Sequence, residues 1–282
     1  QQNIPQKPSS SSDSRRKVIT SKTTSPIALP EVDIDKVTDD PIGAGDSFGF
    51  GTGWGDGAGG SGGGTVQFFG DKQKAKRVVY IVDFSYSMMS TNRQGNTRIE
   101  MLKKELVQSV KRLSPALQFN VIYFSGTGWI GGETATDGKV QERLANPDPR
   151  VRVPWISATK ENRRKVIKEI EAMPVAGQST GGGTMWAPPT KMAMKMRGKP
   201  DLIYLLTDGA AQDSTYFLRN LDELNESKIP IHTTAMELPG EVAQSLIEIA
   251  DRTGGKFSIV LEGKLSTGEG AKKYADPKYN PQ

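Results

Sequence analysis

The sequence predicts an α/β protein built on a doubly wound, mostly parallel open sheet with helices on both faces. The first observation is a regular alternation of short apolar runs with longer amphipathic segments along residues 66–262. Such alternation is typical of parallel strands that are joined through helices. The second observation is a Gly-, Pro- and Ser-rich composition in residues 1–65, which predicts an extended, Gly-rich N-terminal arm outside the sheet.

The apolar runs and the helical periods define the individual elements. Residues 77–83, Arg-Val-Val-Tyr-Ile-Val-Asp, are apolar almost throughout, as in a strand that is buried on both faces. After them, Ile99, Leu102 and Leu106 recur at the spacing of one helix face. The same patterns predict further strands at 119–124, 202–207, 229–236 and 257–261, and helices at 96–113, 160–173, 184–196, 214–225 and 241–252.

Two regions depart from this alternation. Residues 127–150 are punctuated by Gly and Pro and predict a long loop, whose length suggests a functional role. Residues 151–156 contain Pro154, which suits an edge strand because proline cannot donate to an inner ladder. We therefore divide the chain into a Pro/Ser-rich arm at 1–42, a Gly/aromatic segment at 43–65, one domain at 66–262 and a polar tail at 263–282.

The Gly/aromatic segment has the period of a strand. Between Gly45 and Gly57 glycine alternates with other residues, so Phe48, Phe50 and Trp54 would share one face. Glycine weakens an isolated strand but permits another backbone to approach closely. Two interpretations stay open, a flexible tether and a strand that is ordered against a partner. On the second, the three aromatic side chains are candidate partner contacts.

Composition excludes several classes of function. The chain has no cysteine, which rules out disulfides, thiol catalysis and Cys-based zinc sites. The net charge is only +5, and basic residues such as Lys160 and Arg163 alternate with Glu161 and Glu169, as on a solvated helix face. We therefore expect no nucleic-acid partner. No apolar run reaches transmembrane length, so we expect no membrane-spanning segment in this chain.

Signals for catalysis are weak. The pattern Gly55-x-Gly57-x-x-Gly60 fits a dinucleotide fingerprint, but it follows from glycine density and precedes no clear helix. No Gly-Lys-Ser/Thr follows the glycines before Thr184, which argues against a P-loop ATPase. His232, the only histidine, lies inside a predicted strand and is interpreted as a core residue. We expect a protein without enzymatic activity.

Three short motifs follow predicted strands or precede a predicted helix. They are Asp83-Phe84-Ser85-Tyr86-Ser87, Gly-Gly-Gly-Thr184 and Thr207-Asp208-Gly209. Parallel sheets bind ligands at the carboxyl ends of their strands, so these motifs are expected at one site. An all-oxygen set rich in hydroxyls suits a hard cation such as Mg²⁺, with Mn²⁺ or Ca²⁺ as alternatives. A carboxylate from a partner could complete the ligand shell.

Together the motifs resemble the metal-ion-dependent adhesion site of von Willebrand factor type A (VWA) domains. The order of the motifs and of the intervening elements also matches, over residues 66–262. Phe68-Phe69-Gly70, before the first strand, and residues 249–255, before the last, resemble bacterial members found in envelope proteins. The resemblance implies a VWA/Rossmann-like α/β fold, with residues 151–156 as its one antiparallel edge strand.

The resemblance also implies roles for single residues. Ser85, Ser87 and Thr184 would contact the metal directly, whereas Asp83 and Asp208 would act largely through water. The open metal position would take a Glu or Asp side chain from a bound protein. Tyr86 stands where the family usually has glycine. Its ring is predicted to contact a ligand, to cover part of the metal or to impede binding.

These observations lead to three functional hypotheses. The first is a metal-dependent protein-binding module for adhesion or assembly, placed outside the cytoplasm in the envelope or exterior of a bacterium. The second is a structural subunit that assembles with other copies of itself into a filament or complex, through strand donation by its N-terminal arm. The third is an accessory subunit of an AAA-type ATPase.

Overall fold

The computed structural model describes residues 64–146 and 151–276. The N-terminal arm and nearly all of the Gly/aromatic segment lie outside these residues, so the expectations for Phe48, Phe50 and Trp54 stay predictions.

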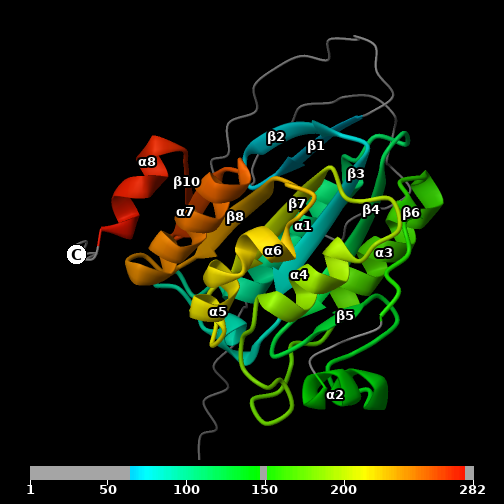
Figure 1. Ribbon diagram of the computed structural model, residues 1–282, viewed down its shortest axis with the longest axis horizontal. Coiled ribbons are helices and arrows are strands. Elements are labelled where there is room, and N and C mark those ends of the chain that lie inside the picture. The colour runs from blue at the N-terminus through cyan, green and yellow to red at the C-terminus, as the bar shows by residue number, and fades with distance from the viewer. Residues whose placement is uncertain (1–63, 147–150, 277–282) are drawn as a thin grey trace, which may run out of the picture. The chain divides into compact units, whose positions relative to one another are not determined.

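The described residues form one mostly parallel sheet of eight strands (Figure 1). The strand order is β10-β9-β8-β7-β3-β4-β5, and β6 pairs with β4 beside this path. The predicted doubly wound α/β class is confirmed. The parallel strands are β3 (Arg77–Asp83), β4 (Gln118–Phe124), β7 (Leu202–Thr207), β8 (Ile231–Met236) and β9 (Phe257–Leu261), and the antiparallel strands are β5 (Gly128–Ile130), β6 (Ile156–Ser157) and β10 (Lys264–Thr267).

Helices cover both faces of the sheet (Figure 1). Alternate residues of β3 face opposite cores: Tyr80 packs in the core under α1 and α3, and Ile81 packs in the core under α4 to α7. The first core also contains the hairpin of β1 (Gly64–Phe68) and β2 (Asp71–Ala75). The helices are α1 (Arg98–Lys111), α2 (Gly138–Ala145), α3 (Lys160–Ala172), α4 (Ala187–Met194), α5 (Ser214–Arg219), α6 (Leu221–Leu224), α7 (Glu241–Thr253) and α8 (Glu269–Lys272), with short 3-10 turns η2 (Tyr86–Met89) and η3 (Lys273–Ala275).

The edges of the sheet differ from the prediction. The edge strand expected at 151–156 is much shorter than predicted, because only Ile156, with Ser157, pairs antiparallel with the start of β4. The longer antiparallel edge is β5, which with α2 lies inside the predicted loop at 127–150. At the other edge, β10 pairs antiparallel with β9, in residues that were expected to be a polar tail. The sheet therefore has antiparallel strands at both edges instead of one.

The chain order places a topological switch point between β3 and β7. From β3 the chain continues to β4 on one side, and it later returns to β7 on the other side of β3. The helices that follow neighbouring strands therefore diverge to opposite faces at this point, and the carboxyl ends of β3 and β7 are left open between them. Asp83 ends β3, and Asp208 directly follows β7.

Asp71 ties the β1–β2 hairpin to the amino ends of the sheet strands. Its carboxylate lies 2.6 Å from Nδ1 of His232 and accepts a hydrogen bond of 3.1 Å from the hydroxyl of Tyr204. Gln73 Nε2 donates to it at 2.7 Å, and Lys256 Nζ lies 3.3 Å away. His232 is buried, as predicted, and it lies at the opposite end of the strands from Asp83.

Replacing Asp71 by asparagine is expected to lower the free energy of unfolding at neutral pH. The further loss of stability on acidification should then be smaller than in the wild type. Burial alone would raise the pKa of Asp71, but the contacts with His232, Gln73 and Lys256 together lower it. A carboxyl group with a lowered pKa in the folded state stabilises the fold above its unfolded pKa, about 3.9, and this contribution is lost as the pH falls further. Urea unfolding at a series of pH values measures the effect, expected at about 1–3 kcal/mol near neutrality. If the free energy of unfolding fell equally steeply with decreasing pH in the wild type and in Asp71→Asn, this role of Asp71 would be contradicted.

Candidate metal centre

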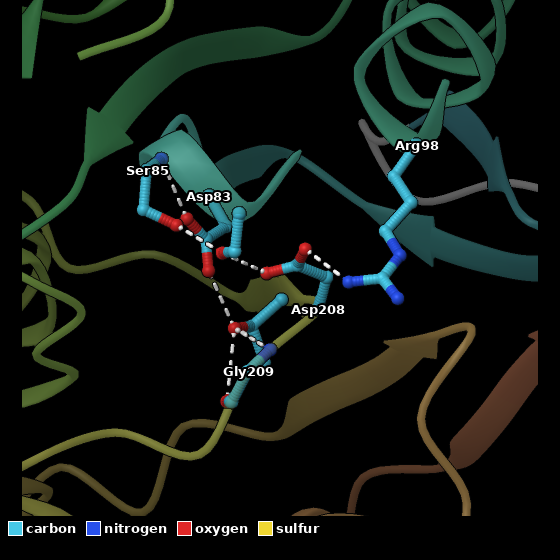
Figure 2. A network of polar contacts seen from close by, with 7 residues as sticks. Asp83, Ser85, Arg98, Asp208 and Gly209 are labelled. Carbon is cyan, nitrogen blue, oxygen red and sulfur yellow. Dashed lines mark hydrogen bonds and ion pairs between the residues drawn. The ribbon is translucent and has the colours of Figure 1, made fainter. Parts of the chain in front are cut away.

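The loop after β3 turns its polar side chains toward the end of β7. Asp83 is fully buried, and its Oδ1 accepts a 2.8 Å hydrogen bond from the backbone N–H of Ser85. The hydroxyl oxygens of Ser85 and Ser87 lie 2.9 Å apart. Ser87 Oγ in turn donates to Asp208 Oδ1 at 2.7 Å. Four of the five predicted ligands thus form one hydrogen-bonded cluster at the switch point (Figure 2).

Two residues that were not assigned roles from the sequence complete this cluster. Thr207, at the end of β7, donates from Oγ1 to Asp83 Oδ2 at 2.6 Å, and so links the two strands. Arg98 Nη1 lies 2.7 Å from Asp208 Oδ2 in an ion pair whose carboxylate is fully buried. Figure 2 shows the guanidinium reaching Asp208 from the side opposite Asp83.

The loop that carries Thr184 is attached to the end of β4. Ser125 Oγ and the backbone N–H of Gly126 both donate to the carbonyl oxygen of Gly181, at 2.5 and 2.7 Å. Thr184 precedes α4 instead of lying inside a helix, and it is buried. It lies beside Gly209, since a Cβ at 209 would stand 3.9 Å from Thr184 Oγ1. The fifth predicted ligand is therefore placed at the margin of the cluster.

Asp213 fixes the same loop from the other side. Its two carboxylate oxygens accept 2.8 Å hydrogen bonds from the backbone N–H groups of Trp186 and Ala187, at the start of α4. The next residue toward the site, Gln212, donates its backbone N–H to the carbonyl oxygen of Thr184 at 2.9 Å. The segment after Asp208 thus holds the Thr184 loop in register with the end of β7.

The two buried carboxylates interact unfavourably in the protein alone. Burial, and next the charge of Asp208, raise the pKa of Asp83 to about 7. The hydrogen bonds from Ser85 and Thr207 act in the opposite direction and only partly compensate. A cation placed between the two carboxylates would favour their charged forms, so the electrostatics of the site suit a positive ligand.

The hydrogen-bonded oxygen atoms are close enough together to become neighbouring ligands of one small octahedral cation. Neighbouring ligands of Mg²⁺, each about 2.0–2.1 Å from the ion, lie about 2.9 Å apart. The Ser85–Ser87 oxygens are 2.9 Å apart, and the Ser87–Asp208 oxygens 2.7 Å. In the described residues no group of three or more His, Cys, Asp or Glu could hold a metal ion. The candidate centre instead combines two carboxylates with hydroxyl groups, the donor set that Mg²⁺ accepts together with water.

Tyr86 lies at the rim of this centre. It begins the turn η2 between the two serines, and 54% of its surface is exposed. Met89, at the end of the same turn, is 49% exposed. Large apolar side chains are usually buried, so two exposed ones beside a polar cluster are candidate contacts for another molecule.

Replacing Gly126 by alanine is expected to displace the Thr184 loop. A Cβ at this position would lie 2.5 Å from the carbonyl oxygen of Gly182 and 2.8 Å from that of Gly181, so backbone would have to move. We expect Mg²⁺ affinity to fall by about tenfold, as measured by calorimetric titration. Gly138→Ala is the matched control, because a Cβ there meets nothing within 4 Å. Equal affinities in the two variants would contradict this account of the loop.

Comparison with known proteins gives matches among solved structures only. No protein-family model matches the chain, and no curated protein matches it. The matching structures include VWA-type domains. One is a von Willebrand factor type A protein from Catenulispora acidiphila, with 17% identity and a TM-score of 0.48 over 68% of this chain and 41% of that chain.

Two further matches are of similar extent. Proximal thread matrix protein 1 from the mussel byssus, with a zinc-occupied MIDAS motif, is 19% identical, with a TM-score of 0.44 over 66% of this chain and 44% of that chain. The PilB minor pilin from Streptococcus sanguinis is 14% identical, with a TM-score of 0.42 over 68% of this chain and 58% of that chain. The chain thus spans less than two thirds of each of these proteins. The strand order and the geometry at Asp83 define the fold and the site.

Proposed function

We propose that this chain is a VWA-type domain that binds another protein through a divalent cation. The cation would be held by Asp83, Ser85, Ser87, Thr184 and Asp208. The observation that carries the proposal is the hydrogen-bonded cluster of two carboxylates and two serine hydroxyls at the switch point. Mg²⁺ is the expected metal, and Mn²⁺ and Ca²⁺ share its preference for oxygen ligands.

The bound cation would supply a positive centre for a Glu or Asp carboxylate of the partner. The chain's own residues prepare this centre. Thr207 and the backbone of Ser85 fix the two oxygens of Asp83, and Ser87 fixes one oxygen of Asp208. Side chains that are already oriented lose little conformational entropy on binding, which favours a specific, reversible contact.

Tyr86 would contribute to the partner surface rather than to the metal. Its side chain is exposed and lies between the two serines in the sequence, so we expect its ring to contact the apolar part of a partner's acidic residue. The proposed partner is a protein that presents such a carboxylate, with a second copy of this chain as the alternative. We place this interaction in the bacterial envelope or exterior. No helix in the described ranges is long and apolar enough to cross a membrane.

Thermal unfolding with and without divalent cations tests the proposal. A ligand at one hundred times its dissociation constant stabilises the folded state by about 2.7 kcal/mol, which corresponds to a rise in Tm of about 5–10 °C for a domain of this size. We expect this rise with MgCl₂ and MnCl₂, and its reversal by EDTA. An unchanged Tm at saturating concentrations of both metals would contradict the proposal.

Once a partner is available, its binding should require the metal. Chelation should abolish the complex, and restored Mg²⁺ should recover it. Asp83→Ala should have the same effect as chelation, because it removes a carboxylate from the cluster. Partner binding that survives both treatments would contradict the metal-dependent mechanism. Sedimentation of the chain alone, with Mg²⁺ and with EDTA, shows whether the partner is a second copy.

A further inference from the structure

Arg98 brings a fixed positive charge to the candidate metal centre. Its Nη1 contacts Asp208 Oδ2, while the other oxygen of that carboxylate accepts from Ser87. The Asp208 carboxylate is therefore held at both ends (Figure 2). The Arg98 side chain keeps 17% of its surface exposed, whereas that of Asp208 is fully buried. Arg98 is thus mostly buried, and it is the more exposed member of the pair.

The position of Arg98 in its helix indicates that this contact is not incidental. Arg98 is the first residue of α1, whose start is fixed by a capping box between Thr97 and Glu100. The first turn of a helix carries a partial positive charge and disfavours another cation. The backbone N–H of Arg98 donates to the carbonyl oxygen of Ser90, so the loop from the metal site closes at this point. The ion pair with Asp208 offsets the unfavourable position.

Counting formal charges shows what Arg98 changes. When both carboxylates are ionised, as a bound cation requires, Asp83 and Asp208 contribute two negative charges, and Arg98 reduces the total to minus one. A divalent cation then leaves the site at plus one, and one carboxylate from a partner makes it neutral. Without Arg98, the metal alone would neutralise the site, and a partner carboxylate would leave it at minus one.

We propose that Arg98 is a specificity-determining residue, which weakens the binding of the metal alone and makes the metal-loaded site selective for a carboxylate. This inference rests on the proposed function. Two effects follow from the same charge: Arg98 repels the incoming dication and attracts the incoming carboxylate. Metal and carboxylate therefore bind cooperatively, and each raises the affinity of the other by the same factor.

Alternative roles for Arg98 predict different behaviour. Arg98 Nε is buried and has no hydrogen-bond partner among the described residues, so the pair with Asp208 is the contact that holds the guanidinium. If Arg98 acted only by holding Asp208 in place, its loss would misplace that carboxylate and lower the affinity for Mg²⁺. If it acts through its charge, its loss raises the affinity for Mg²⁺. The direction of the change in Mg²⁺ affinity therefore distinguishes the two roles.

Metal titrations of the wild type, Arg98→Gln and Arg98→Lys carry the test. Mg²⁺ affinity is measured by calorimetry in sodium chloride and in sodium acetate of equal ionic strength, with acetate as the carboxylate probe. In chloride, we expect Arg98→Gln to bind Mg²⁺ at least about tenfold more tightly than the wild type, and Arg98→Lys to stay close to the wild type. Acetate should raise the Mg²⁺ affinity of the wild type and of Arg98→Lys, but not that of Arg98→Gln.

Thermal unfolding in EDTA gives a second readout. Without metal, Arg98→Gln should unfold about 5 °C or more below the wild type, because the buried Asp208 loses its partner. Where Arg98→Gln fails to fold, Arg98→Met carries the same expectations and keeps the stem of the side chain.

The outcomes separate this inference from the proposed function. Unchanged or weaker Mg²⁺ binding by Arg98→Gln overturns the role of Arg98 while leaving a wild-type metal site intact. An equal acetate effect in the wild type and Arg98→Gln overturns the selectivity for a carboxylate. Absence of Mg²⁺ and Mn²⁺ binding by the wild type and every variant overturns both proposals.

Discussion

Replacing Asp83 by asparagine is expected to abolish stabilisation of the protein by Mg²⁺, while the chain still folds. Asparagine has nearly the size of aspartate and keeps a carbonyl oxygen, so the fully buried position loses its charge but not its volume. The metal would then face one carboxylate that is already paired with Arg98. We expect Mg²⁺ affinity to fall at least about 100-fold, or about 2.7 kcal/mol, as followed by Tm across a MgCl₂ titration.

A surface carboxylate supplies the matched control. The Asp222 side chain is 85% exposed and pairs with Arg252. Asp222→Asn makes the same chemical change on a solvated surface, so its Tm should rise with MgCl₂ as that of the wild type does. A full Mg²⁺ response in Asp83→Asn would show that the cation binds elsewhere.

Replacing Trp186 by alanine is expected to cause a large loss of stability. The Trp186 side chain is fully buried, and its ring meets Phe217 edge-on with 6.0 Å between the centroids. Removing a buried aromatic side chain of this size costs about 3–5 kcal/mol. The free energy of unfolding from urea titration measures the loss. Because Thr184 lies two residues away in the same loop, Mg²⁺ affinity should also fall in this variant.

Trp186→Phe separates packing from hydrogen bonding. The indole Nε1 of Trp186 is buried without a hydrogen-bond partner in the described part of the chain. Phenylalanine keeps much of the ring and removes this unsatisfied donor, which offsets part of the lost contact area. We expect it to cost about half as much as alanine, or less. If phenylalanine destabilised the protein as strongly as alanine, the packing explanation would be wrong.

The central strands could be predicted from the sequence because both of their faces are buried. The predicted bounds 77–83, 202–207 and 257–261 match β3, β7 and β9. A strand that packs helices on both sides must be apolar at every position, and this leaves a clear signal. The predicted helix at 214–225 was less accurate, since it is interrupted at Asn220 to give α5 and α6.

The edge strand β5 could not be found by periodicity because three residues are too few to show a period. β5 has three residues and begins at Gly128, where a Cβ would lie 2.6 Å from the sulfur of Met192 in α4. The glycine that made this region resemble a loop therefore lets α4 approach the sheet. Pro154 lies just before β6, and its carbonyl oxygen accepts from the side chain of Asn120 instead of a ladder N–H.

The residues that bring oxygen atoms to the candidate site could be predicted from the sequence, but Arg98 could not. Asp83, Ser85, Ser87 and Asp208 lie at strand ends that parallel topology brings together, and the structure places them in one cluster. Arg98 was missed because motifs for metal ligands contain only acceptors. The capping box that begins at Thr97 contained a signal, since it assigns an arginine to a helix position that disfavours cations.

The most direct test of the metal centre is an anomalous difference map from crystals grown with Mn²⁺. We expect a peak between the hydroxyl oxygens of Ser85 and Ser87, within ligand distance of Thr184 Oγ1 and next to Asp83 and Asp208. Crystals of Asp83→Asn grown in the same way should lack the peak. A wild-type map at saturating Mn²⁺ with no peak at this position, or with its only peak elsewhere, would contradict the account.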